Sequence, residues 1–269
     1  MGTAYGMWTG ERGFHGTDYR EGGTARMNGN ERGKRLVVLT GAGMSAESGL
    51  KTFRDAGGLW EEYDVMEVAS IEGWHRNPKL VTEFYNQRRE QLAHAEPNLG
   101  HRILAELEGF FDVGIVTQNV DNLHERAGST KVLHLHGELT KVRSVRDETR
   151  VRDIGYGRLE FGETDTDGSP LRPHIVWFGE AVPMIAEASR WVAGADIFAV
   201  VGTSLNVYPA AGLIHDLRSG TPAFLIDPNE VALPGSSHFT VIRAGAGRGM
   251  EILREKLLDL FPGPAPRSR

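Results

Sequence analysis

Residues 36–40, Leu-Val-Val-Leu-Thr, run directly into residues 41–49, Gly-Ala-Gly-Met-Ser-Ala-Glu-Ser-Gly. A short apolar, β-prone run that ends at a glycine turn is typical of a buried strand. Glycines at such a turn let the backbone approach a diphosphate, and a helix that starts there attracts anions. The spacing differs from the dinucleotide fingerprint, because the third glycine comes only at Gly49, and no P-loop Gly-Lys-Ser/Thr follows. A purely structural turn is the alternative for this stretch alone.

Further apolar runs predict the rest of a sheet. Strands are expected at residues 112–117, 197–201 and 223–226. Helical patterns lie between the strands or after them, at residues 78–94, 99–107, 186–193, 210–217 and 251–260. Apolar strands that alternate with helices predict an α/β fold with a parallel sheet covered on both faces.

Two segments interrupt this alternation. Residues 141–172 are polar, charged and glycine-containing, so we expect a small inserted module. Residues 60–95 form a second, helical insertion. Residues 1–33 and 263–269 lack a hydrophobic period, and we expect a flexible N-terminal tail and a flexible C-terminal end.

The composition excludes several classes of function. The 269 residues carry a net charge of −6, which gives no sign of nucleic-acid binding. The sequence has no run of about 18 apolar residues, so it predicts no membrane span. The chain has no cysteine, which excludes disulfides, thiolate metal sites and cysteine nucleophiles. The first residues lack the pattern of a secretory signal, so we expect a cytoplasmic protein.

Polar groups follow the predicted strands, at the sheet edge where α/β proteins bind ligands. Thr117-Gln118-Asn119-Val120-Asp121 could orient an amide or a ribose hydroxyl, or could cap a helix. Gly202-Thr203-Ser204 and Asp227-Pro228-Asn229 follow two other strands and suit ribose hydroxyls. Thr52-Phe53-Arg54-Asp55 could cover a nucleotide, although a packed Phe beside a surface Arg is the alternative.

His134-Leu135-His136-Gly137-Glu138 places two histidines on one face of an extended segment. A metal pair would lack a third ligand nearby. A general base is the better functional interpretation, because histidine titrates near neutrality. A satisfied structural histidine is the alternative.

Taken in order, these motifs resemble the sirtuin family over roughly residues 35–260. The resemblance also includes Pro-His-Ile-Val-Trp-Phe-Gly-Glu at residues 173–180 and Gly-Thr-Ser-Leu-Asn-Val-Tyr-Pro-Ala at residues 202–210. It implies a catalytic domain over residues 34–262, with a Rossmann-like sheet and a small module formed by the two insertions. It implies NAD-dependent removal of acyl groups from protein lysines, yielding nicotinamide and O-acyl-ADP-ribose.

The resemblance also implies site residues. His136, Asn119 and Asp121 would be catalytic, with His136 accepting a proton from a ribose hydroxyl, a step typically worth about 10²–10⁴-fold. His134 does not precede the glycine and is assigned a structural role. NAD would contact Gly41, Ala42, Ser45, Phe53, Arg54, Gln118, Asn119, Asp121, Gly202, Thr203, Ser204, Asp227, Pro228, Asn229 and Gly247.

The substrate side has its own implied residues. An acyl-lysine peptide would add as a strand beside Val176-Trp177-Phe178-Gly179 and residues 205–207. Ala69, Tyr85 and Arg88 resemble the set of sirtuins that favour succinyl and malonyl lysine. Tyr85 and Arg88 are three residues apart and share a helix face, where they could bind a terminal carboxylate. A solvated helix face is the alternative, since Arg89 is also present. We expect deacetylation as a second activity.

The sequence departs from the family at its metal. Most sirtuins hold the small module with four cysteines around zinc, which typically contributes about 10–16 kcal/mol of apparent binding energy in small folds. Residues 141–172 contain no cysteine and no histidine, so no zinc is expected. We predict a small apolar core instead, formed by Val142, Val145, Val151, Ile154, Tyr156, Leu159 and Phe161.

Two other functions stay open at this stage. One is mono-ADP-ribosyl transfer, and the other is an NAD or ADP-ribose binding module that has lost catalysis. Retention of Asn119, Asp121 and His136 favours deacylation. Acyl-lysine proteins or peptides are the expected partners, with no nucleic acid and no membrane, and the chain is expected to be a monomer.

Overall fold

The computed structural model describes residues 33–50, 63–232 and 238–262. Phe53, Arg54, nearly all of the predicted tail and the predicted C-terminal end lie outside these residues. Within the described part of the chain, no helix is both long and apolar enough to cross a membrane.

A six-stranded sheet forms the centre of the fold, and all its neighbouring strands are parallel. Its order is β3-β2-β1-β7-β8-β9. Their bounds are β1 Arg35–Thr40, β2 Asp112–Thr117, β3 Val132–His134, β7 Ile197–Val201, β8 Ala223–Ile226 and β9 Phe239–Ile242. Strand order reverses at β1, so the carboxyl ends of β1 and β7 mark the switch point where such sheets bind ligands.

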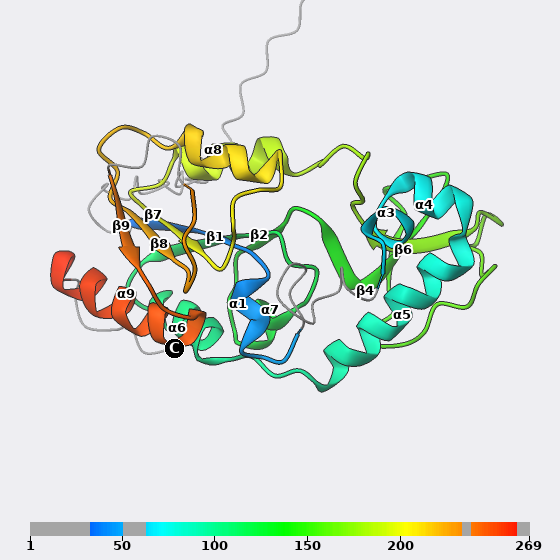
Figure 1. Cartoon of the computed structure of the whole chain (residues 1–269), viewed down its shortest axis with the longest axis horizontal. Coiled ribbons are helices and arrows are strands. Elements are labelled where there is room, and N and C mark those ends of the chain that lie inside the picture. Colours follow the sequence, from blue (N-terminus) through cyan, green and yellow to red (C-terminus); the bar gives the residue numbers. More distant parts are fainter. Residues whose placement is uncertain (1–32, 51–62, 233–237, 263–269) are drawn as a thin grey trace, which may run out of the picture. The chain divides into compact units, whose positions relative to one another are not determined.

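Helices cover both faces of this sheet (Figure 1). Leu36 and Val38 of β1 pack in the core with α6 (Leu99–Leu107) and α9 (Ala246–Leu260). Val37 and Leu39 pack in the opposite core with α8 (Ile185–Ala193) and the 3-10 helix η1 (Ala210–Asp216). Adjacent strand residues therefore face opposite layers, as a doubly covered parallel sheet requires. The predicted Rossmann-like α/β class is confirmed.

The last helix starts five residues earlier than its predicted start at Glu251. Gly247 and Gly249 lie in its first turns, and glycine weakens a helix prediction. A Cβ on Gly249 would lie only 2.1 Å from Cγ2 of Ile226. The glycine is thus needed for the close approach of α9 to β8. The segment after Pro209 also differs from expectation, because it forms a 3-10 helix.

A separate three-stranded antiparallel sheet includes residues 141–144, 151–153 and 171–172 of the polar insertion. Its order is β5-β4-β6, with β4 at Gly137–Ser144, β5 at Val151–Asp153 and β6 at Leu171–Ile175. The helical insertion contributes α3 (Val65–Val68), α4 (Ile71–Arg76) and α5 (Pro78–His94). Helix α5 contacts both β4 and β6, as Figure 1 also shows.

The apolar core of residues 141–172 is smaller than predicted. Val142, Leu159 and Leu171 are buried together, with Ile154 packed against them. The other four members of the predicted core, Val145, Val151, Tyr156 and Phe161, are exposed. They lie in the short strands and turns of a three-stranded sheet that is too small to cover them.

Candidate active site

The turns after β1 and β7 touch at the switch point of the sheet. The Gly43 amide donates to the carbonyl of Gly202 over 2.8 Å. Gly202 has φ of +62°, and a Cβ there would lie 2.3 Å from the Met44 nitrogen. The positive φ favours glycine, and the close contact with Met44 leaves no room for a Cβ. The two glycine turns thus pack backbone against backbone at the carboxyl ends of β1 and β7.

The helix after the first turn differs from expectation. Helix α1 (Gly43–Ala46) has a single turn, and the amides of Met44 and Ser45 donate to the carbonyls of Gly41 and Ala42. The donors expected at a helix N-terminus are therefore used inside the turn. Within the described residues, the Ala42 amide has no hydrogen-bond partner.

The loop after β2 brings the predicted polar residues together around Ser45. The Asn119 amide donates to the carbonyl of Gly41 over 3.0 Å and to the Ser45 hydroxyl over 3.1 Å. The Ser45 hydroxyl donates to Asp121 over 2.9 Å. Burial raises the pKa of Asp121, while the Leu123 amide, Ser45 and His134 act in the opposite direction. The structure thus joins Ser45, Asn119 and Asp121 into one buried cluster.

His136 lies beside the same loop, with one nitrogen prepared to accept a proton. Its Nδ1 is 3.0 Å from the carbonyl of Gln118. Because a carbonyl only accepts, Nδ1 carries the hydrogen, and Nε2 of the neutral ring keeps its lone pair. Burial lowers the pKa of His136, partly opposed by the Gln118 carbonyl. The neutral form, which a general base needs, therefore dominates at pH 7.

Two further buried histidines, which none of the predicted site motifs includes, contact Ser45 and the last residue of β1. His101 Nε2 lies 3.5 Å from the Ser45 hydroxyl, and His124 Nε2 lies 3.1 Å from the hydroxyl of Thr40. Burial lowers the pKa of His101 to about 4 and that of His124 well below its usual range, so both are neutral. The sequence signal was the start of α6, where Asn98 and His101 form a capping box.

The remaining predicted nucleotide contacts lie along the neighbouring strand ends. Gln118 donates to the Thr203 hydroxyl over 3.1 Å, which links the turns after β2 and β7. Asp227 follows β8 and accepts the Asn229 amide over 2.8 Å. The Gly247 amide donates to Glu47 over 3.1 Å, a partner that the sequence analysis missed. Ser204 and Pro228 are exposed beside these groups.

The predicted acyl pocket has buried polar groups on the inner face of α5. Tyr85 is 4% exposed and Arg88 is 8% exposed, which contradicts the alternative of a solvated helix face. The Trp177 indole donates to the Tyr85 hydroxyl over 3.0 Å, so the phenol proton is left to donate elsewhere. Burial raises the pKa of Tyr85 to about 12, which keeps that proton in place at neutral pH.

Arg89 has a different position from Arg88, although both are buried. Its Nε donates to the carbonyl of Leu139 and its Nη1 to Asn86, each over 2.6 Å. It therefore joins α5 to β4.

The segment expected to bind peptide is already partly paired. The amides of Val176, Trp177 and Phe178 donate to the His136 carbonyl, Glu180 and the Ala69 carbonyl. The Phe178 carbonyl accepts from the amide of Ile71 over 3.0 Å. A peptide strand at this edge would have to use the remaining backbone groups of Val176 and Gly179.

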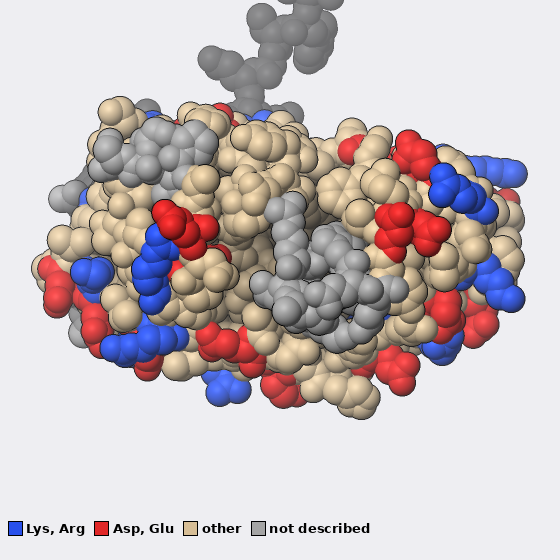
Figure 2. Space-filling model, in the orientation of Figure 1, with Lys and Arg blue, Asp and Glu red and all other residues tan. Residues whose placement is uncertain are grey.

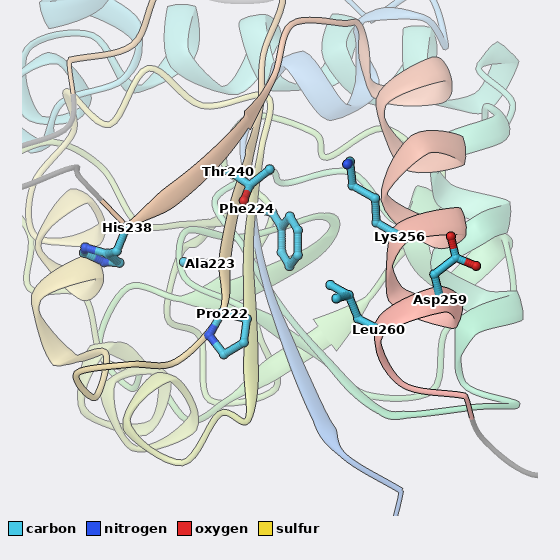
Figure 3. A pocket seen from close by; sticks show the side chains of 8 residues that line it. All are labelled: Pro222, Ala223, Phe224, His238, Thr240, Lys256, Asp259 and Leu260. Carbon is cyan, nitrogen blue, oxygen red and sulfur yellow. The ribbon is translucent and has the colours of Figure 1, made fainter.

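A pocket of about 350 Å³ lies elsewhere, between β8, β9 and α9 (Figure 3). Pro222 and Ala223, at the amino end of β8, line it together with Phe224, Lys256 and Leu260. It contains none of the predicted site residues. The polar cluster at the carboxyl ends of the strands is thus the better candidate for chemistry.

The sequence of this site matches that of a known protein family. The model of the Sir2 family matches residues 41–209, which include both glycine turns, the loop after β2 and His136. The chain belongs to the Sir2 family. Sir2 relatives include a protein of Bacteroides thetaiotaomicron named "NAD-dependent protein deacylase", 56% identical over 87% of this chain and 100% of its own length. A Helicobacter pylori protein of the same name is 50% identical over 84% of this chain and 99% of its own.

Solved Sir2 structures show the same fold. A Sir2 homologue in complex with NAD has a TM-score of 0.76 and 39% identity, covering 85% of this chain and 91% of its own. A mutant Sir2 homologue with ADP-ribose has a TM-score of 0.78 and 38% identity, covering 86% and 94%.

The residues of this Sir2 chain fit NAD. The glycine-rich turns after β1 and β7, at the switch point of the sheet, and the Ala42 amide suit a diphosphate. Asn119 and Asp121 can orient a ribose or an amide, and Asp227 suits ribose hydroxyls at the next strand end.

The residues do not fit the zinc of most Sir2 proteins. The chain has no cysteine, and the described residues contain no group of three or more His, Asp or Glu side chains that could hold a metal. Carboxylates in the 141–172 segment pair with arginines: Arg150 contacts Asp165 and Asp167, and Arg152 contacts Glu163. These carboxylates are committed to arginines.

Proposed function

We propose that this chain is an NAD-dependent protein-lysine deacylase that prefers succinyl and malonyl groups and retains deacetylation. Membership of the Sir2 family and relatives named as NAD-dependent protein deacylases at 50–56% identity support the deacylase activity. Acyl-lysine proteins or peptides are the substrates. The preference for acidic acyl groups rests on the pocket of α5.

The burial of Tyr85 and Arg88 on one face of α5 is the observation that carries this preference. A buried guanidinium and a phenol donor can bind a carboxylate through charge-assisted hydrogen bonds. Burial lowers the pKa of Arg88, and its interactions with Tyr85 and Asp121 oppose that effect. The electrostatic effect of Asp121 on Arg88 supports an acyl pocket beside the catalytic loop (residues 118–122, after β2). Ala69, a small residue beside the paired Phe178, leaves room for a longer acyl chain.

The catalytic residues have two roles: one accepts a proton, and the others position the reacting groups. Bound NAD supplies the ribose that receives the acyl group while nicotinamide leaves. Nε2 of His136 accepts the proton of a ribose hydroxyl, because its Nδ1 is occupied by the Gln118 carbonyl. Ser45 holds Asn119 and Asp121 in a fixed arrangement through its two hydrogen bonds.

The small module is held without zinc in this proposal. The Asn86–Leu159 and Arg89–Leu139 contacts, the core of Val142 and Leu171 and the arginine–carboxylate pairs replace the metal. We also propose that the protein is a cytoplasmic monomer, as expected from the sequence. Basic and acidic side chains are interspersed over the face in Figure 2, and its described residues form no continuous basic patch of the kind that binds nucleic acid.

Comparison of acetyl-, malonyl- and succinyl-lysine peptides with NAD tests the proposal. In Arg88→Met, kcat/KM for the succinyl peptide should fall about 10–100-fold relative to that for the acetyl peptide, since a hydrogen bond to a charged group contributes about 1.5–3 kcal/mol. Arg76→Met is the matched control, because Arg76 is exposed on the neighbouring helix α4. Equal succinyl activity in the parent and Arg88→Met would overturn the pocket assignment.

A further inference from the structure

His134 is held by two acceptors at once. Its Nδ1 lies 3.2 Å from the carbonyl of Asn119, and its Nε2 lies 2.8 Å from a carboxylate oxygen of Glu125. A neutral imidazole has one N–H, and a ring with two acceptors needs two. The geometry therefore requires the doubly protonated, positively charged ring. The side chain of His134 is only 9% exposed, so this charge depends on its partner.

The pair connects both ends of the catalytic loop. His134 is the last residue of β3, and Glu125 lies in α7 (Leu123–Arg126), which begins directly after the loop. The loop residue that His134 contacts is Asn119, whose side chain donates to Ser45.

His136 contacts the preceding carbonyl, that of Gln118. Two histidines of one extended segment thus hold two consecutive carbonyls, one ring being neutral and the other charged.

We infer that the His134–Glu125 ion pair is a positioning device for the catalytic loop, which holds Asn119 and Asp121 in their active arrangement only while His134 is protonated. The inference rests on the proposed function, because it assigns these loop residues to deacylation. His134 is a positioning residue, since it acts through the Asn119 backbone and through its charge near Asp121.

The charged groups around His134 come from several elements. Glu125 and His124 lie on α7, Asp121 lies in the loop, and Glu138 lies on β4. Burial lowers the pKa of His134, but the hydrogen bond and charge of Glu125, with Glu138 and the Asn119 carbonyl, raise it above its ordinary value of 6.5. Burial raises the pKa of Glu125, and His134, with a smaller contribution from Lys141 on β4, outweighs that effect and lowers it. Both shifts favour an ion pair at neutral pH.

The two histidines then set opposite limits on activity. The pKa of His136 is lowered from 6.5, so its base form is lost as the pH falls through a value below 6.5. The pKa of His134 is raised, so its charged form is complete below 6.5 and is lost as the pH rises through a higher value. On deprotonation one of its two hydrogen bonds must break, and Asp121 loses a neighbouring positive charge. The pH profile of kcat/KM should therefore be bell-shaped, with His134 responsible for the alkaline limb.

The test measures kcat/KM against pH in the full chain, with NAD and the acyl peptide that the parent turns over fastest. His134→Gln should lower kcat/KM about tenfold at pH 7, as expected for the loss of a charged hydrogen bond, and should abolish the alkaline limb. Glu125→Gln, which keeps an acceptor but removes the charge, should move that limb to lower pH. The two substitutions combined should cost no more than His134→Gln alone. His75→Gln, at an exposed histidine of α4, is the control and should keep the parent profile.

Nitrogen-15 NMR of the parent gives a readout that is independent of turnover. Both ring nitrogens of His134 should be protonated at pH 7. A neutral ring, or an unchanged alkaline limb in a folded His134→Gln, would overturn the inference. A parent without NAD-dependent acyl removal would instead overturn the proposed function, and the NMR result would still decide the charge of His134.

Discussion

Replacement of Asn86 by Ala tests what holds the cysteine-free module in place. Asn86 is 3% exposed on α5 and forms hydrogen bonds with the backbone of Leu159, which is 2% exposed. Its amide donates to the Leu159 carbonyl over 3.0 Å, and its carbonyl accepts the Leu159 amide over 2.9 Å. The same carbonyl accepts from Arg89 over 2.6 Å. One side chain thus ties the helical insertion to the polar one.

The expected loss follows from these three hydrogen bonds. Asn86→Ala leaves an N–H and a C=O of Leu159 and one N–H of Arg89 without this partner in a buried site. A buried polar group that loses its partner costs about 1–3 kcal/mol, so the loss of three partners should cost the variant about 3–9 kcal/mol of local stability. The Arg150–Asp165 and Arg152–Glu163 pairs are more exposed, and each should contribute at most about 1 kcal/mol. The Asn86 contact should therefore dominate.

Hydrogen exchange followed by mass spectrometry measures this effect at the Leu159 amide. Exchange there should accelerate by at least about 100-fold in Asn86→Ala, which corresponds to about 3 kcal/mol of opening free energy. Glu83→Ala is the matched control, because Glu83 lies one turn earlier and pairs with Arg158 at the surface. The reasoning is refuted if protection of Leu159 in Asn86→Ala equals that in Glu83→Ala.

Three further outcomes are expected. Exhaustive chelation should leave deacylation intact, and loss of activity with EDTA that zinc restores would contradict the zinc-free module. His136→Ala should abolish turnover while calorimetry shows nearly parental NAD affinity, because within the described residues the ring's hydrogen bond is to the Gln118 carbonyl. A large loss of affinity would place His136 in cofactor binding instead. Gly202→Ala should weaken NAD binding and lower the Tm by several degrees, because its Cβ would lie 2.3 Å from the Met44 nitrogen. Gly220→Ala is the control and should spare NAD binding, because no atom lies within 4 Å of its Cβ. Equal NAD affinities in these two variants would argue against the turn contact.

The central strands could be predicted because each is a continuous apolar run, buried on both faces. The outer strands β3 and β9 were missed for the opposite reason. β3 has only three residues, and β9 is exposed at Thr240 and Val241, so neither shows a clear apolar run. Their place in the sheet depends on pairing with β2 and β8, which local sequence does not encode.

The order of the motifs predicted the residues of the candidate site. It did not predict the groups that support them, such as His101, His124 and Arg89. Periodicity placed Tyr85 and Arg88 on one helix face but could not show that this face is buried. A second arginine, Arg89, suggests a solvated face in the sequence, yet it is 1% exposed because the Leu139 carbonyl and Asn86 satisfy part of its guanidinium. His101 and His124 meet Ser45 and Thr40 only through tertiary packing, across separations of 56 and 84 residues.

Mass spectrometry of the products tests the central claim most directly. A succinyl-lysine peptide incubated with NAD and the full chain should lose its succinyl group, with nicotinamide and O-succinyl-ADP-ribose formed in equal amounts. His136→Ala should give no O-succinyl-ADP-ribose, since no base would accept the ribose hydroxyl proton. A peptide that keeps its succinyl group and gains ADP-ribose would contradict the account and make the chain an ADP-ribosyltransferase.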